Sequence, residues 1–222
     1  MNQSYDSNIH MILTEASTPL DTKTRILNAA EKLFGMNGFD ATSLRDITAE
    51  AQVNLAAVNY HFQSKDSLID AVIERRILPI SQRRLKMLDA AGHPPSVEQI
   101  VEAFLAPLLM PEVLPAVPLI GRVLSNPDQF FDRVFKKHLQ NVAERFSQAI
   151  REAIPELSPE EAFWRLFFMA GSMTQVLALS SVLPKISGQH VDRDALMRRL
   201  ATFVVSGLRA PVAAVNPVRK ES

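Results

Sequence analysis

The stretch that decides the fold is VNLAAVNYHF at residues 53–62, followed directly by SKD at residues 64–66. It predicts a short helix whose exposed face is uncharged, aromatic and amide-bearing, which suits a DNA groove. Just upstream, SLRD at residues 43–46 has the Ser-x-x-Asp spacing of a capping box, which begins another short helix. Two short helices separated by a turn at residues 52–54 are typical of a helix-turn-helix.

Composition and cysteine content bound the class of protein. The chain has 222 residues, 47% hydrophobic and 22% charged, which is ordinary for a globular protein with one sizeable core or two modest ones. It has no cysteine, which excludes disulfides, thiolate metal sites and cysteine nucleophiles. Residues 1–20 lack a signal-peptide pattern, and no later stretch approaches the ~18 uninterrupted apolar residues of a membrane span. We therefore expect a soluble, cytoplasmic protein.

The charge balance limits how the chain can hold nucleic acid. Lys and Arg total 24, as do Asp and Glu, so DNA contact must be focused rather than driven by bulk charge. Residues 1–70 even carry nine acidic side chains against five basic ones. Placement still favours DNA, because Lys23, Arg25, Arg45 and Lys65 lie at or near expected helix starts, where backbone N–H groups also attract phosphate.

Hydrophobic periodicity, caps and breakers predict helices throughout the chain and no convincing strand. The expected helices span residues 22–36, 43–51, 54–61, 65–90, 96–109, 119–124, 128–153, 158–182 and 192–208. Pro79 is expected to kink or break the fourth of them. The basic residues of this fourth helix are expected on a solvated face: Arg75, Arg76, Arg83, Arg84 and Lys86.

Residues 22–72 resemble the TetR/AcrR family of bacterial transcriptional repressors. The resemblance rests on TKTRILNAAEKLFGMNGFDATSLRDITAEA, then VNLAAVNYHF, then SKDSLIDAV. Beyond residue 72 it is one of length and helical texture. It implies an all-α fold with a flexible arm (1–20), a three-helix helix-turn-helix DNA-binding domain (21–68), a helical ligand-binding and dimerisation domain (69–210) and a flexible tail (211–222).

The resemblance also implies that the third helix lies in the major groove of DNA. It turns one set of side chains outward: Asn54, Leu55, Ala57, Asn59, Tyr60 and His61. A second set is turned to the core: Val53, Ala56, Val58 and Phe62. Gln52 stands where the family usually has glycine, so either a left-handed backbone there carries some strain or the turn differs slightly.

Base readout by this helix is expected to be sparse. Asn59 is the candidate for an adenine edge, and Leu55 or Ala57 for a thymine methyl. The candidates for phosphate contact are Thr42, Ser43, Arg45, Tyr60, His61 and Lys65. The alternative is a helical hairpin with Tyr60 and His61 packed in a core. A motif that reads a few base pairs commonly acts as a dimer on two half-sites, which predicts an inverted-repeat operator.

The dimer surface is expected on the last two long helices. One carries a small-residue stripe: Ala170, Gly171, Thr174, Ala178 and Ser181. The other carries an apolar face: Leu196, Leu200, Phe203, Val204 and Leu208. The alternative is that both stripes close the core of the monomer. Dimerisation through a four-helix bundle of these helices is what the resemblance implies.

Aromatic residues and methionines gather in the C-terminal part, where the resemblance implies a pocket for a small apolar or amphipathic inducer. The candidate lining residues are Phe104, Phe131, Phe135, His138, Trp164, Phe167 and Phe168. The alternative is that these side chains form core, since an aromatic stripe at helical spacing is typical of one. Arg122, His138 and Arg165 are candidates for an anionic head group, or else are exposed or paired structurally.

These observations favour a ligand-responsive repressor that binds double-stranded DNA as a homodimer and leaves it when an effector binds. One alternative keeps the DNA reader but makes the C-terminal domain a docking surface for a protein partner. A compact apolar cavity would favour the effector and an exposed apolar groove the partner. An all-α enzyme is the other alternative, but the sequence has no His-Glu-x-x-His, Gly-x-Ser-x-Gly or glycine-rich phosphate loop. No cofactor or metal is expected.

Overall fold

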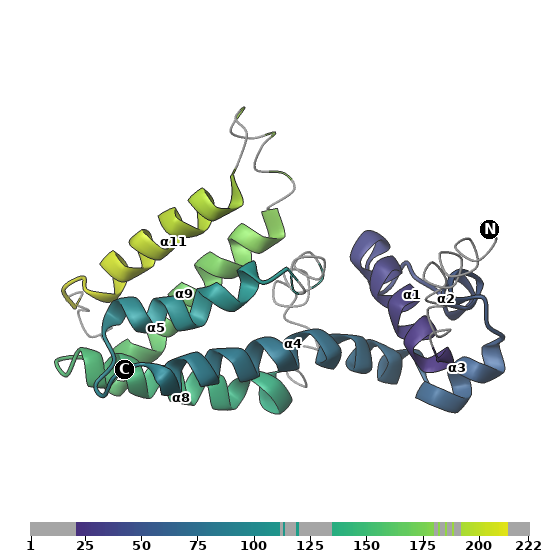
Figure 1. Ribbon diagram of the computed structural model, residues 1–222, viewed down its shortest axis with the longest axis horizontal. Helices are drawn as coiled ribbons and strands as arrows, with labels where there is room; N and C mark the ends of the chain where they lie inside the picture. Colours follow the sequence, from purple (N-terminus) through teal and green to yellow (C-terminus); the bar gives the residue numbers. More distant parts are fainter. Residues whose placement is uncertain are drawn as a thin grey trace, which may run out of the picture.

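A computed structural model describes residues 21–111, 113, 119, 135–179, 182, 185, 188 and 192–212. All regular structure in these residues is helical, which confirms the all-α prediction. Three short helices form a cluster at one end of the molecule, and one long helix leads from it into a second helical bundle (Figure 1). The predicted helix at residues 119–124 and the start of the one at 128 lie outside the described residues, apart from Leu119.

The N-terminal cluster contains helices α1 (Thr22–Asn37), α2 (Leu44–Ala51) and α3 (Leu55–Phe62). Each begins at a side chain that accepts a backbone N–H: Asp21 for α1, Ser43 for α2 and Asn54 for α3. Ser43 and Asp46 form the predicted capping box. The hydroxyl of Ser43 donates to the carboxylate of Asp46 and lowers its pKa. Local sequence therefore sets where these helices begin.

The turn between α2 and α3 depends on a left-handed residue. Gln52 has φ 53° and ψ 49° at the C-terminus of α2, so a side chain sits where glycine is the cheaper choice. Arg25 of α1 stabilises this turn, because its Nη2 donates to the carbonyl oxygens of Ala51 (2.6 Å) and Gln52 (2.8 Å). Arg25 was expected near DNA phosphate, but in the structure its guanidinium donates hydrogen bonds to the backbone of this turn.

Helix α4 (Lys65–Ala90) belongs to two hydrophobic cores. Its residues as far as Ile77 pack with α1, α2 and α3, whereas Ile80 and Leu88 pack with the C-terminal helices. Pro79 lies between the two sets, inside the helix. The two cores therefore meet along α4 at Pro79, and the division of domains at residue 68 stays a prediction.

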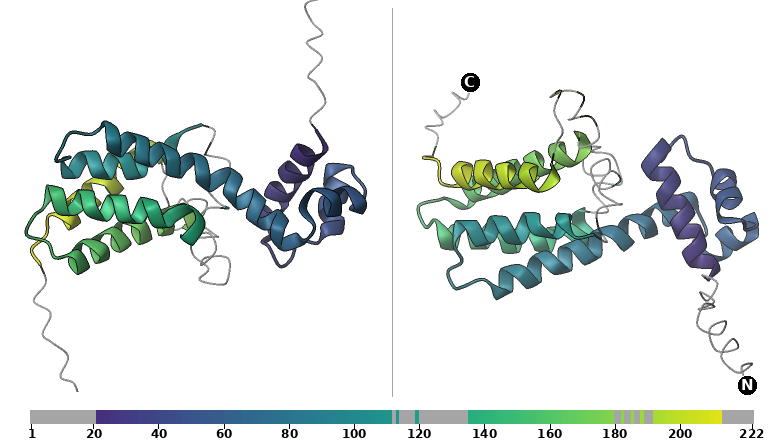
Figure 2. Two further views of the ribbon diagram at one scale, coloured as in Figure 1. Left: turned by 90° about the horizontal axis from the view of Figure 1, so that it is seen from below. Right: turned by 45° about the horizontal axis from the view of Figure 1, so that its top comes forward.

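The second bundle surrounds the far half of α4. It contains α5 (Val97–Leu105), the 3₁₀ turn η1 (Ala106–Leu109), the π-helical turn η3 (Phe135–Leu139), α8 (Gln140–Ala153), α9 (Pro159–Leu179) and α11 (Arg193–Leu208). Helix α9 packs against α8 and α11, and α5 lies between α4 and α11 (Figures 1 and 2). By length and composition α9 could cross a membrane, but its inner face is part of the bundle core.

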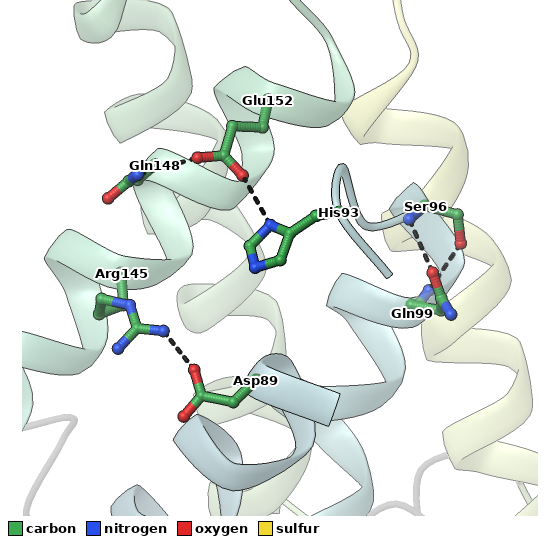
Figure 3. Close-up of polar contacts among 7 residues, drawn as sticks. All are labelled: Asp89, His93, Ser96, Gln99, Arg145, Gln148 and Glu152. Carbon is green, nitrogen blue, oxygen red and sulfur yellow. Dashed lines mark hydrogen bonds and ion pairs between the residues drawn. The ribbon is translucent and has the colours of Figure 1, made fainter. Parts of the chain in front are cut away.

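Polar contacts fasten the end of α4 to α8 (Figure 3). Arg145 of α8 pairs with Asp89 near the end of α4. Glu152 accepts from Gln148 at 2.8 Å and lies 3.8 Å from Nδ1 of His93, just beyond α4. These exposed contacts fix the direction in which the chain leaves α4 more than they add stability.

Candidate DNA-binding face and effector cavity

Helix α3 presents an open face with little charge. Tyr60 is 84% exposed and Leu55 44% exposed, and Asn59 is also exposed. His61 is half-buried, and its ring meets that of Tyr60 edge-on at 5.1 Å between centroids. Val58 and Phe62 point the other way into the N-terminal core. The hairpin alternative, with Tyr60 in a core, is therefore wrong.

Two expectations for this face are corrected by the structure. Thr42 is fully buried, and its hydroxyl donates to the carbonyl of Gly38 at 2.7 Å, so it has no side-chain group to offer phosphate. Ala56 and Ala57 exchange roles, since Ala56 is exposed and Ala57 packs against the core. The cause is the helix geometry, because a turn of about 100° per residue carries Ala56 to the side of α3 opposite the buried Val58.

The remaining candidates lie at the N-termini of helices. Ser43 and Asn54 use their side-chain oxygens as caps, at 3.1 Å and 2.9 Å from the backbone nitrogens they accept from. Arg45 is exposed in the first turn of α2, and Lys65 is half-buried at the first residue of α4. These positions combine side-chain charge with helix N-termini, an arrangement suited to phosphate.

Part of the acidic excess of the N-terminal region is engaged in contacts within the fold. Asp21 and Asp46 cap helices. Glu50 pairs with Lys32 at 2.7 Å. Glu31 pairs with Nη2 of Arg76 at 2.6 Å, with both side chains largely buried. These internal contacts offset part of the repulsion that DNA phosphate would otherwise meet, as the placement argument requires.

The C-terminal bundle contains an apolar cavity of about 430 Å³ between α4, α5, η3, α8 and α9. This volume is in the usual range for small-molecule sites. Its aromatic lining residues are Phe104, Phe135, Phe163 and Phe167, and its polar lining residues are Arg84, Thr174 and Gln175. Of the predicted lining residues, Phe104, Phe135 and Phe167 therefore border one cavity.

The other predicted lining residues are elsewhere. Trp164 (44% exposed) and Phe168 (62% exposed) stack on the outer surface of α9, so they do not line the cavity. His138 does not line it either; its carbonyl accepts from Ser81 at 3.1 Å, and burial lowers the pKa of its ring. Phe131 lies outside the described residues.

Arg84 is the residue of this site that sequence reasoning assigned wrongly. It was expected on a solvated face but is 5% exposed. Its guanidinium lies 4.0 Å from the centre of the Phe104 ring, and its Nε donates to the carbonyl of Phe104 at 2.8 Å. Burial lowers the pKa of Arg84 to about 9, so the group is still charged at neutral pH. The i+4 spacing from buried Ile80 and Leu88 was the available signal.

The other candidates for an anionic head group differ from Arg84. Arg165 is 6% exposed, but its Nε donates to the carboxylate of Glu161 at 2.9 Å and its Nη1 to the carbonyl of Leu208. It is therefore paired structurally. Arg122 lies outside the described residues.

The two stripes predicted for dimerisation contain both buried and exposed residues. Leu200, Val204 and Leu208 are buried in the bundle core, as the monomer alternative has it, whereas Phe203 is 67% exposed. Gly171 and Ala178 are exposed on α9. Ser181 lies outside the described residues. The exposed apolar surface available to a second copy is thus mainly aromatic.

Two family descriptions match the chain, one on each side of Pro79. Residues 26–72 match "Bacterial regulatory proteins, tetR family", and residues 98–207 match "Tetracyclin repressor-like, C-terminal domain". The chain belongs to the TetR family. Members of this family are transcriptional regulators, and this protein is a DNA-binding transcriptional regulator rather than an enzyme.

Relatives of known sequence and structure agree with TetR-family membership. The chain is 28% identical over 199 residues to the HTH-type transcriptional regulator UidR of Escherichia coli (strain K12), which covers 84% of this chain and 92% of UidR. A TetR-like transcriptional regulator from Rhodococcus sp. RHA1 superposes with a TM-score of 0.63 at 19% identity, over 84% and 95% of the two chains. A putative tetR family regulator from Shewanella sp. PV-4 gives 0.63 at 20%, over 84% and 96%. Both structures share the fold.

Proposed function

We propose that this protein is a cytoplasmic homodimeric repressor that binds an inverted-repeat operator and is released by a small apolar or amphipathic effector. The observation that carries the proposal is the course of α4. This one helix packs against the DNA-binding helices as far as Ile77 and lines the apolar cavity at Arg84. Ligand and DNA sites therefore share a rigid element with one interruption, at Pro79.

Two further contacts join the cavity to the DNA-binding end. Leu139 lines the cavity and also packs against the N-terminal core. Its neighbour Lys137 donates to Glu74 of α4 at 2.7 Å, which lowers the pKa of that carboxyl. An effector that displaces Leu139 thereby acts on the placement of α3. It weakens DNA binding only as far as it binds the operator-incompatible arrangement better.

Selection of bound sequences from a random DNA pool tests the proposal, using the full-length protein at a stated moderate salt concentration. Recovery of an inverted repeat, with a dimer in sedimentation experiments, is the expected result. Phe168→Glu with Phe203→Glu is the matched variant, because both side chains are exposed and their change leaves the cores intact. We expect it to be monomeric and to lose the repeat. No enrichment by a folded dimer would contradict the proposal.

A docking surface for a protein partner is the second candidate function. The exposed aromatic face of α9 favours it, since Trp164 is 44% exposed and Phe168 is 62% exposed, and neither lines the cavity. In a homodimer, the second copy of the chain would cover much of this face and leave little of it for another protein. A monomer in solution that still selects a single half-site would therefore favour the docking interpretation over the dimer.

A further inference from the structure

Among the described residues, Arg84 is a buried cation without an ion-pair partner. Its recorded contacts among the described residues are a carbonyl, a thioether and an aromatic ring, with no carboxylate within ion-pair distance. Removing a guanidinium from water is unfavourable by several kcal/mol unless an opposite charge and full hydrogen bonding compensate. Arg165, equally buried, has Glu161 for this purpose. The described residues around Arg84 therefore stabilise its buried charge only in part.

The hydrogen bonds of Arg84 show which nitrogens are available. Nε is fixed by the Phe104 carbonyl at 2.8 Å, which orients the guanidinium plane. Nη2 contacts only the sulfur of Met173, at 3.0 Å, and a thioether is a weak acceptor. Nη1 has no hydrogen-bond acceptor in the described part of the chain, and it is not fully shielded from solvent. The two terminal nitrogens form the fork that binds an oxyanion with two hydrogen bonds.

The cavity around this fork is otherwise apolar. Arg84 is the charged residue among its described lining, and Thr174 and Gln175 are the only other polar side chains there. A purely hydrocarbon ligand would cover Arg84 further and leave its charge unpaired, which raises the free-energy cost of burying that charge. A cationic ligand would repel it. A ligand with an anionic group on an apolar body would pair with Arg84 and also contact the apolar side chains of the cavity.

We propose that the effector carries an anionic group, a carboxylate or a sulfonate-like oxyanion, which the terminal nitrogens of Arg84 bind while its apolar body fills the cavity. The inference rests on the proposed function, since it names the chemistry of the ligand of that same cavity. Arg84 lies on α4 just beyond Pro79. An anion bound there acts directly on the helix that supports the DNA reader.

A matched pair of fluorescent probes tests the inference on the full-length protein. 8-Anilinonaphthalene-1-sulfonate and N-phenyl-1-naphthylamine share an aromatic body, and only the first carries an anionic group. We expect Arg84→Met to weaken binding of the sulfonate probe about tenfold or more, the usual scale for a charge-assisted hydrogen bond. Binding of the neutral probe should change by less than about twofold, because the cavity volume is nearly kept. Equal losses, or no loss, for both probes would overturn the inference.

Two control variants place the effect in the cavity, and a competition experiment is the fallback. Arg83→Met removes an exposed charge from the next residue of α4 and should leave both affinities unchanged. Gly171→Leu should weaken both probes, because Gly171 lines the cavity and its added side chain starts in open space. If Arg84→Met does not fold, displacement of the neutral probe from wild type replaces it. Decanoate should then compete better than decan-1-ol, and equal competition would overturn the inference.

The outcome is separable from that of the proposed function. Operator selection measures the DNA reader and does not involve Arg84. If the protein selects an inverted repeat and Arg84→Met changes the affinity of neither probe, the repressor proposal stands and the anionic effector is rejected. Failure of the sulfonate probe to bind wild type at all would also reject it.

Discussion

The two halves of α4, on either side of Pro79, differ in how the charge of one arginine is compensated. On the DNA-binding side, Nη2 of Arg76 lies 2.6 Å from the Glu31 carboxylate of α1. On the cavity side, about 12 Å further along the helix axis, Arg84 is more deeply buried and has no carboxylate partner in the described chain. The first arrangement joins two elements of the fold. The second leaves a charge that a ligand can compensate.

Removing each charge in turn gives the largest expected difference. Arg76→Met strands the Glu31 carboxylate, whose Oε2 is already buried without an acceptor or donor partner in the described residues. We expect a loss of about 3 kcal/mol in the free energy of unfolding. Arg84→Met replaces an uncompensated cation by an apolar side chain, so its cost should stay within about 1 kcal/mol. Urea denaturation measures both, and similar losses for the two variants would contradict the distinction.

A second prediction sharpens the role of the DNA-binding end. Asn59→Ala should cost about 1–3 kcal/mol in operator affinity and relax preference at one symmetric pair of positions. Lys65→Ala should weaken all sequences alike and make the salt dependence shallower by about one per subunit. Binding titrations on the selected operator and its single-base variants distinguish them. A uniform loss across these variants for Asn59→Ala would remove its base-reading role.

The pH dependence of stability tests the cavity end. Burial lowers the pKa of Arg84 to about 9, well below the ordinary value of a guanidinium. Between these values the unfolded state binds more protons than the folded state, so stability rises with pH, and below pH 9 the burial penalty is fully present. Relative to Arg84→Met, the wild type should therefore gain about 1–2 kcal/mol between about pH 8 and 10.5. Parallel curves for the two proteins would show that Arg84 is better compensated than the structure indicates.

The smallest effect is expected at the junction of the two ends. Pro79 has no N–H to donate to the carbonyl of Arg75, so the helix is weakest there. Pro79→Ala should change the coupling between effector and operator by about 0.5–1 kcal/mol and leave operator affinity without effector nearly unaltered. Release of labelled operator by increasing effector measures this, with the exposed Gln82→Ala as the matched control. An unchanged release curve for the folded variant would end the hinge interpretation.

Local rules in the sequence located the helices well. Ser43, Ser64 and Ser96 begin helices as predicted, because each cap is decided by side chains within three residues. Gln52 adopts the left-handed conformation that its place in the turn required. Such features are readable because they need no partner from elsewhere in the chain.

Features that depend on distant partners were not readable. Arg84 is buried because α5 supplies the Phe104 ring and carbonyl and α9 supplies Met173, contacts that no local pattern encodes. Trp164 and Phe168 resemble core residues by type, and only the placement of α8 and α11 shows that α9 turns them outward.

The division of α4 between two cores has a consequence for building new regulators. Because the cores separate between Ile77 and Ile80, a crossover at Pro79 would exchange one DNA-reading head for another without cutting through either core. Among the described residues, the contacts that a chimera must preserve include the Lys137–Glu74 pair and the packing of Leu119 and Leu139 against the DNA-binding domain. Pro79 in α4 is therefore a place where recombination can combine the DNA-binding domain of one regulator with the effector-binding domain of another.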